Sequence, residues 1–97
     1  MSERTRQAAS RLVSDIADDI HICDAIRELL DATSMDVPLP TEPWHHDRDT
    51  LWRAALVDAA HAAADPTPVR LRRAIETATL LDALDHPSAY GHARRTA

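Results

Sequence analysis

The chain has few of the residues that build β-structure and tight turns. Its 97 residues include one Gly and no Asn, beside eighteen Ala. Hairpin turns and bulges depend on residues that accept positive φ angles, which are chiefly Gly and Asn. This shortage argues against a sheet-rich fold and indicates an all-α protein. Phe is also absent, so the core must be assembled from Leu, Ile, Val and two Trp.

Cysteine and long apolar runs are scarce as well. A single Cys excludes an intramolecular disulfide and is typical of a protein from a reducing compartment. No apolar run approaches the length that a bilayer requires, and the start MSERTRQ is not followed by the apolar core of a signal peptide. We therefore expect a soluble, cytoplasmic protein with no membrane partner.

Lysine is absent too, so all eleven basic residues are Arg. Sixteen acidic residues oppose them and leave a net charge of −5. An acidic surface disfavours non-specific binding to nucleic-acid phosphates, so we do not expect a nucleic-acid partner. The same charge attracts basic proteins and speeds their association, which makes a basic protein the expected class of hetero-partner.

The longest periodic stretch, residues 8–32, predicts one amphipathic helix. It contains no Gly or Pro, and its apolar residues recur at helical spacing, with Ile16, Cys23 and Leu30 at one heptad position. The opposite side is polar and includes His21. Because side chains two apart on a helix do not face each other, His21 and Cys23 are not expected to form a chelating pair.

A second helix is expected after a Pro-rich linker that spans residues 34–42. Thr41 is the first candidate for its N-cap, and Asp47 and Asp49 are the alternatives. The helix should end before Pro66, and Trp44 and Trp52 should belong to its inner side.

The third helix has the clearest boundaries in the chain. Thr67 is a good N-cap, Pro68 suits a first helical position, and Pro87 should prevent the helix from continuing past Asp85. Residues 87–97 show no periodic pattern and are predicted to be a flexible C-terminal tail. Residues 1–86 would then form a single helical domain.

Short connections favour antiparallel neighbours, so the expected fold is a three-helix antiparallel bundle with a long first helix. At 1.5 Å per residue the first helix would be roughly 40 Å long and the others about 30 Å or less. A first helix that overhangs its partners leaves apolar surface uncovered. We therefore expect a homodimer, formed through the first helix into a larger bundle.

This topology would separate the charges along the bundle. Basic side chains from the starts of the first and third helices would meet at one end, while most carboxylates, Asp31 among them, would lie at the other. Guanidinium groups match phosphate and carboxylate, which makes the basic end a candidate anion or partner patch. The alternative is that these groups are solvated or pair with Asp and Glu. The residues of this Arg patch are Arg4, Arg11, Arg70 and Arg73.

The opposite end would bring imidazoles and carboxylates together, where the second helix begins and the third ends. Such groups bind zinc and other divalent ions, although no known zinc-binding spacing is present. The candidate ligand or metal residues are His45, His46, Asp47, Asp82, Asp85 and His86. The structural alternative is that Asp82, on an inward-facing side, accepts a hydrogen bond from His45 and closes the bundle end.

No motif indicates catalysis, because the chain has neither a phosphate-binding Gly loop nor a Ser–His–Asp spacing. We expect a small acidic, non-enzymatic interaction or regulatory protein that acts through protein–protein contacts. The alternatives are a ligand- or metal-binding protein that uses the His/Asp end, and an enzyme with a pocket at the dimer interface. No cofactor is expected beyond a divalent metal. A cavity lined by Trp44, Trp52 and His45 would favour the alternatives.

Overall fold

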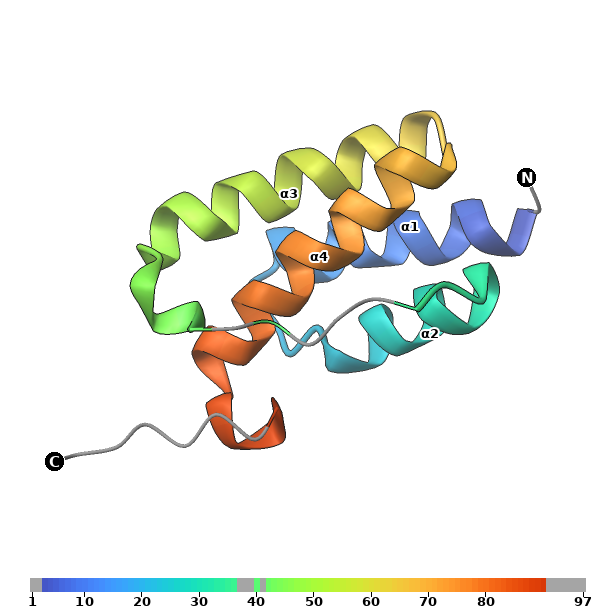
Figure 1. The fold of residues 1–97 in the computed structure, drawn as a ribbon. Coiled ribbons are helices and arrows are strands. Elements are labelled where there is room, and N and C mark those ends of the chain that lie inside the picture. Colours follow the sequence, from blue (N-terminus) through green and yellow to red (C-terminus); the bar gives the residue numbers. More distant parts are fainter. Residues whose placement is uncertain (1–2, 37–39, 41, 91–97) are drawn as a thin grey trace, which may run out of the picture.

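The computed structural model describes residues 3–36, 40 and 42–90 of the chain. These residues form four α-helices and two short 3₁₀ helices, and none of them lies in a strand, so the all-α prediction is confirmed. No helix among them is long and apolar enough to cross a bilayer. In chain order the elements are α1 (Glu3–Ala17), α2 (Cys23–Thr33), η1 (Pro43–His45), α3 (Arg48–Ala64), α4 (Pro68–Asp85) and η2 (Pro87–Tyr90) (Figure 1).

The prediction of one long helix over residues 8–32 is wrong, because the stretch forms α1 and α2. Asp19 takes a left-handed φ of 55° just after α1. The amide of Ile20 donates to the carbonyl of Asp15 at 3.2 Å, and the amide of Asp19 donates to that of Ile16 at 3.1 Å. This pair of bonds is the Schellman pattern that ends helices. Asp accepts the left-handed conformation more readily than most residues with a side chain.

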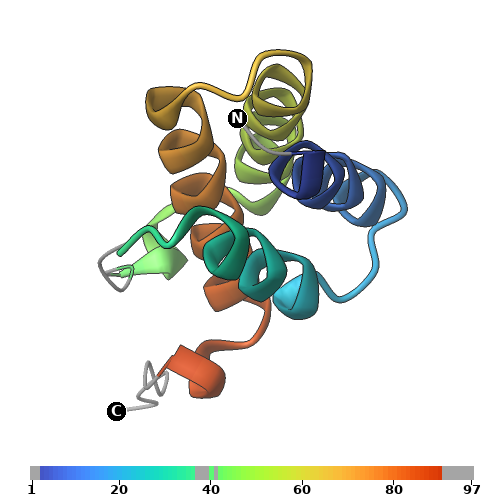
Figure 2. The same ribbon diagram turned by 90° about the vertical axis from the view of Figure 1, so that its right-hand side faces the viewer.

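The four helices surround one core, which is clearest when the molecule is viewed from its end (Figure 2). α1 packs against α2 and α3, and α4 packs against α3 and α2. The two helices of each pair run antiparallel to one another. The start of α3 therefore lies at the opposite end of the molecule from the end of α2 (Figure 1). The result is a four-helix arrangement in place of the expected three-helix bundle.

Three of the four helices supply the large side chains that are fully buried in the core. Leu12 and Ile16 come from α1, Leu29 from α2, and Leu71 and Ile75 from α4, and all five are fully buried. α3 presents mostly small side chains to the core, which lets the helices beside it approach closely. Its buried residues are Leu51, Ala55, Ala59 and Ala62.

α4 begins and ends where its sequence punctuation predicts. The hydroxyl of Thr67 accepts a hydrogen bond from the amide of Arg70 at 3.3 Å, and Pro68 is the first helical residue. The helix ends at Asp85, before Pro87. Residues 87–90, the first part of the predicted tail, form η2 and pack against α4. Residues 91–97 of the predicted tail lie outside the described residues.

α3 begins later than the first candidate cap suggests. Thr41 lies outside the described residues, and the N-cap of α3 is Asp47, one of the two alternatives. Its carboxylate accepts hydrogen bonds from the amide and the hydroxyl of Thr50, at 3.0 and 2.9 Å. These two bonds lower the pKa of the Asp47 carboxyl, since they favour its ionised form.

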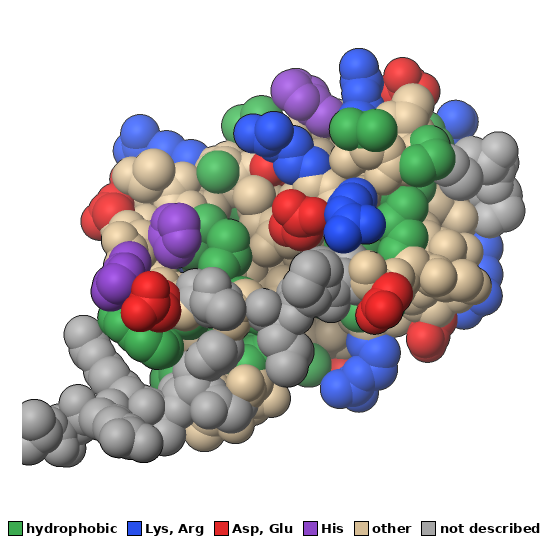
Figure 3. All heavy atoms as spheres, in the orientation of Figure 1, with side chains coloured by type: hydrophobic (Ala, Val, Ile, Leu, Met, Phe, Trp, Pro, Cys, Tyr) green, Lys and Arg blue, Asp and Glu red, His purple; other side chains and the backbone are tan. Residues whose placement is uncertain are grey.

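The predicted separation of charge along the bundle is wrong. Because α2 returns along α1, the C-terminal end of α2, which carries Asp31, lies beside the N-terminal end of α1 (Figure 1). Arg11 of α1 forms an ion pair with Glu28 of α2. Acidic and basic side chains also occur together at both ends of the face shown in Figure 3.

Candidate metal centre

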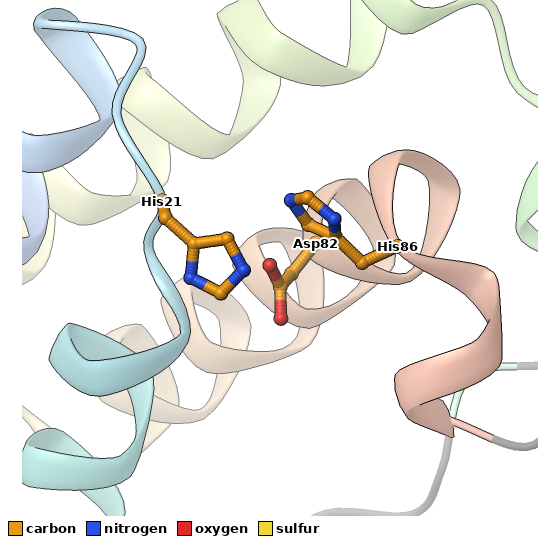
Figure 4. Close-up of side chains that lie close together, drawn as sticks. All are labelled: His21, Asp82 and His86. Atoms are coloured by element: carbon orange, nitrogen blue, oxygen red, sulfur yellow. The ribbon is translucent and has the colours of Figure 1, made fainter.

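Two histidines and an aspartate that are far apart in the sequence meet at one end of the bundle (Figure 4). His21 lies in the connector between α1 and α2, Asp82 in the last turn of α4, and His86 just after α4. Each offers one imidazole nitrogen or carboxylate oxygen, and these three atoms lie within 4.8 Å of one another. Imidazole nitrogen and carboxylate oxygen are ligands that zinc accepts. We call these three residues the His–Asp–His cluster.

The cluster has a buried carboxylate and an exposed pair of rings. Asp82 is only 2% exposed, whereas His21 and His86 are both exposed. The centroids of the two imidazole rings lie 4.3 Å apart, with an angle of 49° between the ring planes. An ion in this cluster would therefore be held from the protein side by a negative charge and flanked by imidazoles near the surface.

Local structure explains why the three side chains converge. Asp82 and His86 are one helical turn apart, a spacing that places two side chains on the same side of a helix. The amide of His86 donates to the carbonyl of Asp82 at 2.8 Å and ends α4 there. His21 reaches them because the left-handed turn at Asp19 ends α1 and leads the chain past the end of α4.

Tyr90 fixes the carboxylate of the cluster. Its hydroxyl donates to Oδ2 of Asp82 at 2.5 Å. Burial and then this hydrogen bond to the carboxylate raise the pKa of Tyr90 above its usual range, so the hydroxyl keeps its proton and remains a donor. Outer hydrogen-bond partners of this kind orient the ligands of metal ions.

Arg48 joins the segments on either side of the cluster. Its Nε and Nη2 donate to the two carboxylate oxygens of Asp85, at 2.8 and 3.0 Å, and Nη2 also donates to Oδ1 of Asp19 at 2.7 Å. These hydrogen bonds raise the pKa of Arg48. A bidentate pair within a small network is the kind of exposed ion pair that contributes to structure, whereas isolated pairs contribute little. The start of α3 is thereby tied to the connector and to the end of α4.

A cavity of about 20 Å³ lies at the same place. All three residues of the His–Asp–His cluster line it, as do Asp19, Arg48 and Asp85. A cavity of roughly 10–15 Å³ is enough for one water molecule. The cavity can therefore hold a single water molecule or ion.

Three other residues of the predicted His/Asp site line a larger neighbouring cavity of about 420 Å³. Its lining includes Trp44, His46, Asp47 and Asp85. Figure 3 shows histidine and acidic side chains beside apolar ones at the end of the bundle where α3 begins. The candidate residues are thus divided between two places, with Asp82 and His86 in the His–Asp–His cluster.

His45 belongs to neither cavity lining. Its side chain is 63% exposed, and its Nδ1 lies 3.5 Å from the carboxylate of Glu42. His45 is the last residue of the short helix η1, which ends before α3 begins, so His45 does not share the helical register that was expected to turn it inward. The inward position of Asp82 is confirmed, but its hydrogen-bond donor is Tyr90 and not His45.

The Arg patch is largely neutralised within the chain. Three of its four members contact carboxylates, and Arg4 is exposed. The pairs are Arg11 with Asp15 and Glu28, Arg70 with Asp65 at 3.5 Å, and Arg73 with Asp58 at 3.3 Å. This arrangement leaves less positive charge available for an external anion.

Sequence reasoning missed three residues of this region: His21, Tyr90 and Arg48. The predicted helix over residues 8–32 places His21 on its polar side, and Tyr90 lies within the predicted tail. A signal for the first was present, because Asp15, Asp18 and Asp19 have low helix propensity and Asp accepts the left-handed conformation that ends α1. Recognising the break there would have placed His21 in a connector.

No known protein family, curated protein or solved structure showed significant similarity to this chain.

Proposed function

We propose that this protein binds a divalent transition-metal ion, and that zinc is the ion that suits it best. The observation that carries the proposal is the convergence of three donor atoms from His21, Asp82 and His86 within 4.8 Å of one another. A mixed set of two imidazoles and one carboxylate favours zinc and similar ions over calcium and magnesium, which prefer oxygen ligands.

Three further features support the proposal. A cavity large enough for one ion lies at the cluster. Tyr90 holds one oxygen of the Asp82 carboxylate and leaves the other to face the histidines. The Arg48 network ties the connector that carries His21 to the end of α4. The Asp82 carboxylate and the segments that carry the two histidines are thus held by contacts that do not depend on the ion.

Zinc titration by calorimetry tests the proposal on the untagged, chelator-treated protein. We expect one zinc ion per chain for the wild type. His21→Ala and His86→Ala should each weaken binding at least about 100-fold, because loss of a direct ligand should exceed the roughly 10–100-fold effect of losing an outer hydrogen-bond partner.

His61→Ala is the matched control, since His61 is an exposed histidine in the last turn of α3 and is not part of the cluster. Its affinity for zinc should equal that of the wild type. Heat no greater than that of the buffer, or the same loss of affinity in all three variants, would overturn the proposal.

A second proposal is that the protein acts through protein–protein contacts, with another copy of itself or with a basic partner. Apolar side chains on its surface support it: Ile20, Val57 and Val69 are 54%, 51% and 78% exposed. The long first helix from which a dimer was expected is absent from the described residues. α1 does not extend into a long overhang, and its apolar side is buried within the protomer.

Light scattering tests self-association directly. The dimer proposal predicts a mass of twice the 10.7 kDa chain at micromolar concentration without added metal. Val57→Asp, on the exposed side of α3, should shift the protein toward monomer if that helix takes part. A wild-type protein that is monomeric under these conditions contradicts the dimer.

A further inference from the structure

The His–Asp–His cluster provides fewer donors than a metal ion needs. Zinc takes at least four ligands, and structural zinc sites take all four from protein. Among the described residues, the group that can approach one ion contains three donors, one each from His21, Asp82 and His86. We infer that the bound ion keeps at least one exchangeable position, which is filled by water or by a small monoanion. This inference rests on the proposed function.

The burial of the ligands shows on which side that position lies. Asp82 is almost completely buried, whereas both imidazoles are exposed. An ion that contacts all three would have the carboxylate toward the protein and its remaining positions toward solvent. Figure 4 shows the two rings approaching the carboxylate from opposite sides, and both rings belong to exposed residues. Solvent can therefore reach the ion and exchange on it.

The cavity at the cluster, about 20 Å³, has room for the ion itself, so a further ligand has to reach the ion from its solvent side. A narrow ligand such as azide can bind there through one terminal atom and extend into solvent. A ligand that must enclose the ion from several directions does not fit, because Asp82 and the two rings occupy those directions.

Local charge disfavours a ligand with more than one negative charge. A divalent ion with the carboxylate of Asp82 has a net charge of +1. Arg48 is paired with two carboxylates, those of Asp19 and Asp85, so this network adds a net charge of −1 beside the ion. The ion can bind water, hydroxide or another monoanion, whereas a multiply charged anion is repelled by the nearby carboxylates.

The reaction that follows is a ligand exchange. Water leaves the ion with its lone pair, and the anion donates a lone pair in its place, so no redox partner is required. An ion with such a position acts as a Lewis acid toward whatever group it binds. This property distinguishes the site from a purely structural zinc site, where protein ligands occupy every position.

Cobalt substitution tests the inference, since the visible absorption of Co²⁺ depends on its ligands. Wild-type protein loaded with Co²⁺ is titrated with sodium azide, with sodium chloride as the ionic-strength control. We expect the visible bands to shift in wavelength and intensity, and to saturate with azide. His86→Ala should show no protein-bound cobalt bands before or after azide is added.

The outcomes separate the inference from the proposal on which it rests. If the wild type shows no protein-bound cobalt bands, the metal-binding proposal itself fails. If the bands are present but azide leaves them unchanged while Co²⁺ stays bound, the inference is overturned. Half an ion per chain together with a doubled mass also overturns it, because a second copy would then fill the remaining positions.

Discussion

Replacing Asp82 with Asn is expected to weaken zinc binding at least about 100-fold while the helical fold is retained. Asn has nearly the same shape, and its carbonyl oxygen can still accept the hydrogen bond from Tyr90. The substitution therefore removes the negative charge from the cluster and keeps the buried contact. Calorimetry measures the affinity, and circular dichroism at the same temperature verifies the fold.

Asp85→Asn is the matched control for this experiment. Asp85 is less than one turn further along the chain, and its carboxylate pairs with Arg48 and does not belong to the cluster. Both substitutions remove one negative charge near the ion, but Asp85→Asn weakens the Arg48 network beside the cluster, whereas Asp82→Asn removes the direct contact with the ion. If Asp82→Asn binds zinc as tightly as the wild type, then Asp82 is only a hydrogen-bond acceptor that closes the bundle end.

Replacing Trp52 with Ala is expected to lower the free energy of unfolding by about 3 kcal/mol, the lower end of the range for buried Trp. Trp52 is half-buried and packs against the core from α3. Its indole N–H also donates to the carbonyl of Ile16 at 2.8 Å, in the last turn of α1. The substitution removes both the packing and this bond between helices. Urea unfolding followed by circular dichroism measures the change.

Two further variants separate these contributions. Trp52→Phe keeps most of the apolar contact and loses the hydrogen bond, which should cost roughly 1–2 kcal/mol. Trp44→Ala removes a more exposed Trp, with 38% of its surface accessible, and should cost clearly less than Trp52→Ala. A loss below about 1 kcal/mol for Trp52→Ala contradicts the packing described for α3.

How far the sequence could predict the fold depends on how local each signal was. Thr67, Pro68 and Pro87 act within one turn of the chain, and the bounds of α4 follow from them. The start of α3 was ambiguous, because Thr41 and Asp47 are both good caps with Pro or acidic residues after them. Only the packing of α3 against α1 and α4 decides between two such sites.

The break between α1 and α2 was hidden by the periodicity itself. Ile16 before the break and Ile26 after it both face the same core, so apolar spacing continues across a connector that is not helical. Asp19 supplies the left-handed turn that Gly would have signalled. A prediction that relies on Gly and Pro as helix terminators overlooks such a turn.

The sequence predicted part of the candidate site, because some of its members are close together in the chain. The inward position of Asp82 follows from its place on α4, and the sequence pattern predicted it. Its association with His86 follows from spacing along one helix. The third member, His21, comes from a distant segment whose position depends on the fold-back of α2, and no local pattern reports that contact.

The antiparallel pairs α1–α2 and α3–α4 can be regarded as two helical hairpins, each built from contacts close in sequence. Such local contacts form early in folding, whereas docking of one hairpin on the other closes long loops and comes later. His21 belongs to the first hairpin, and Asp82 and His86 belong to the second. The full set of donor atoms exists only after the hairpins have docked, so a bound ion would report that final step and would slow its reversal.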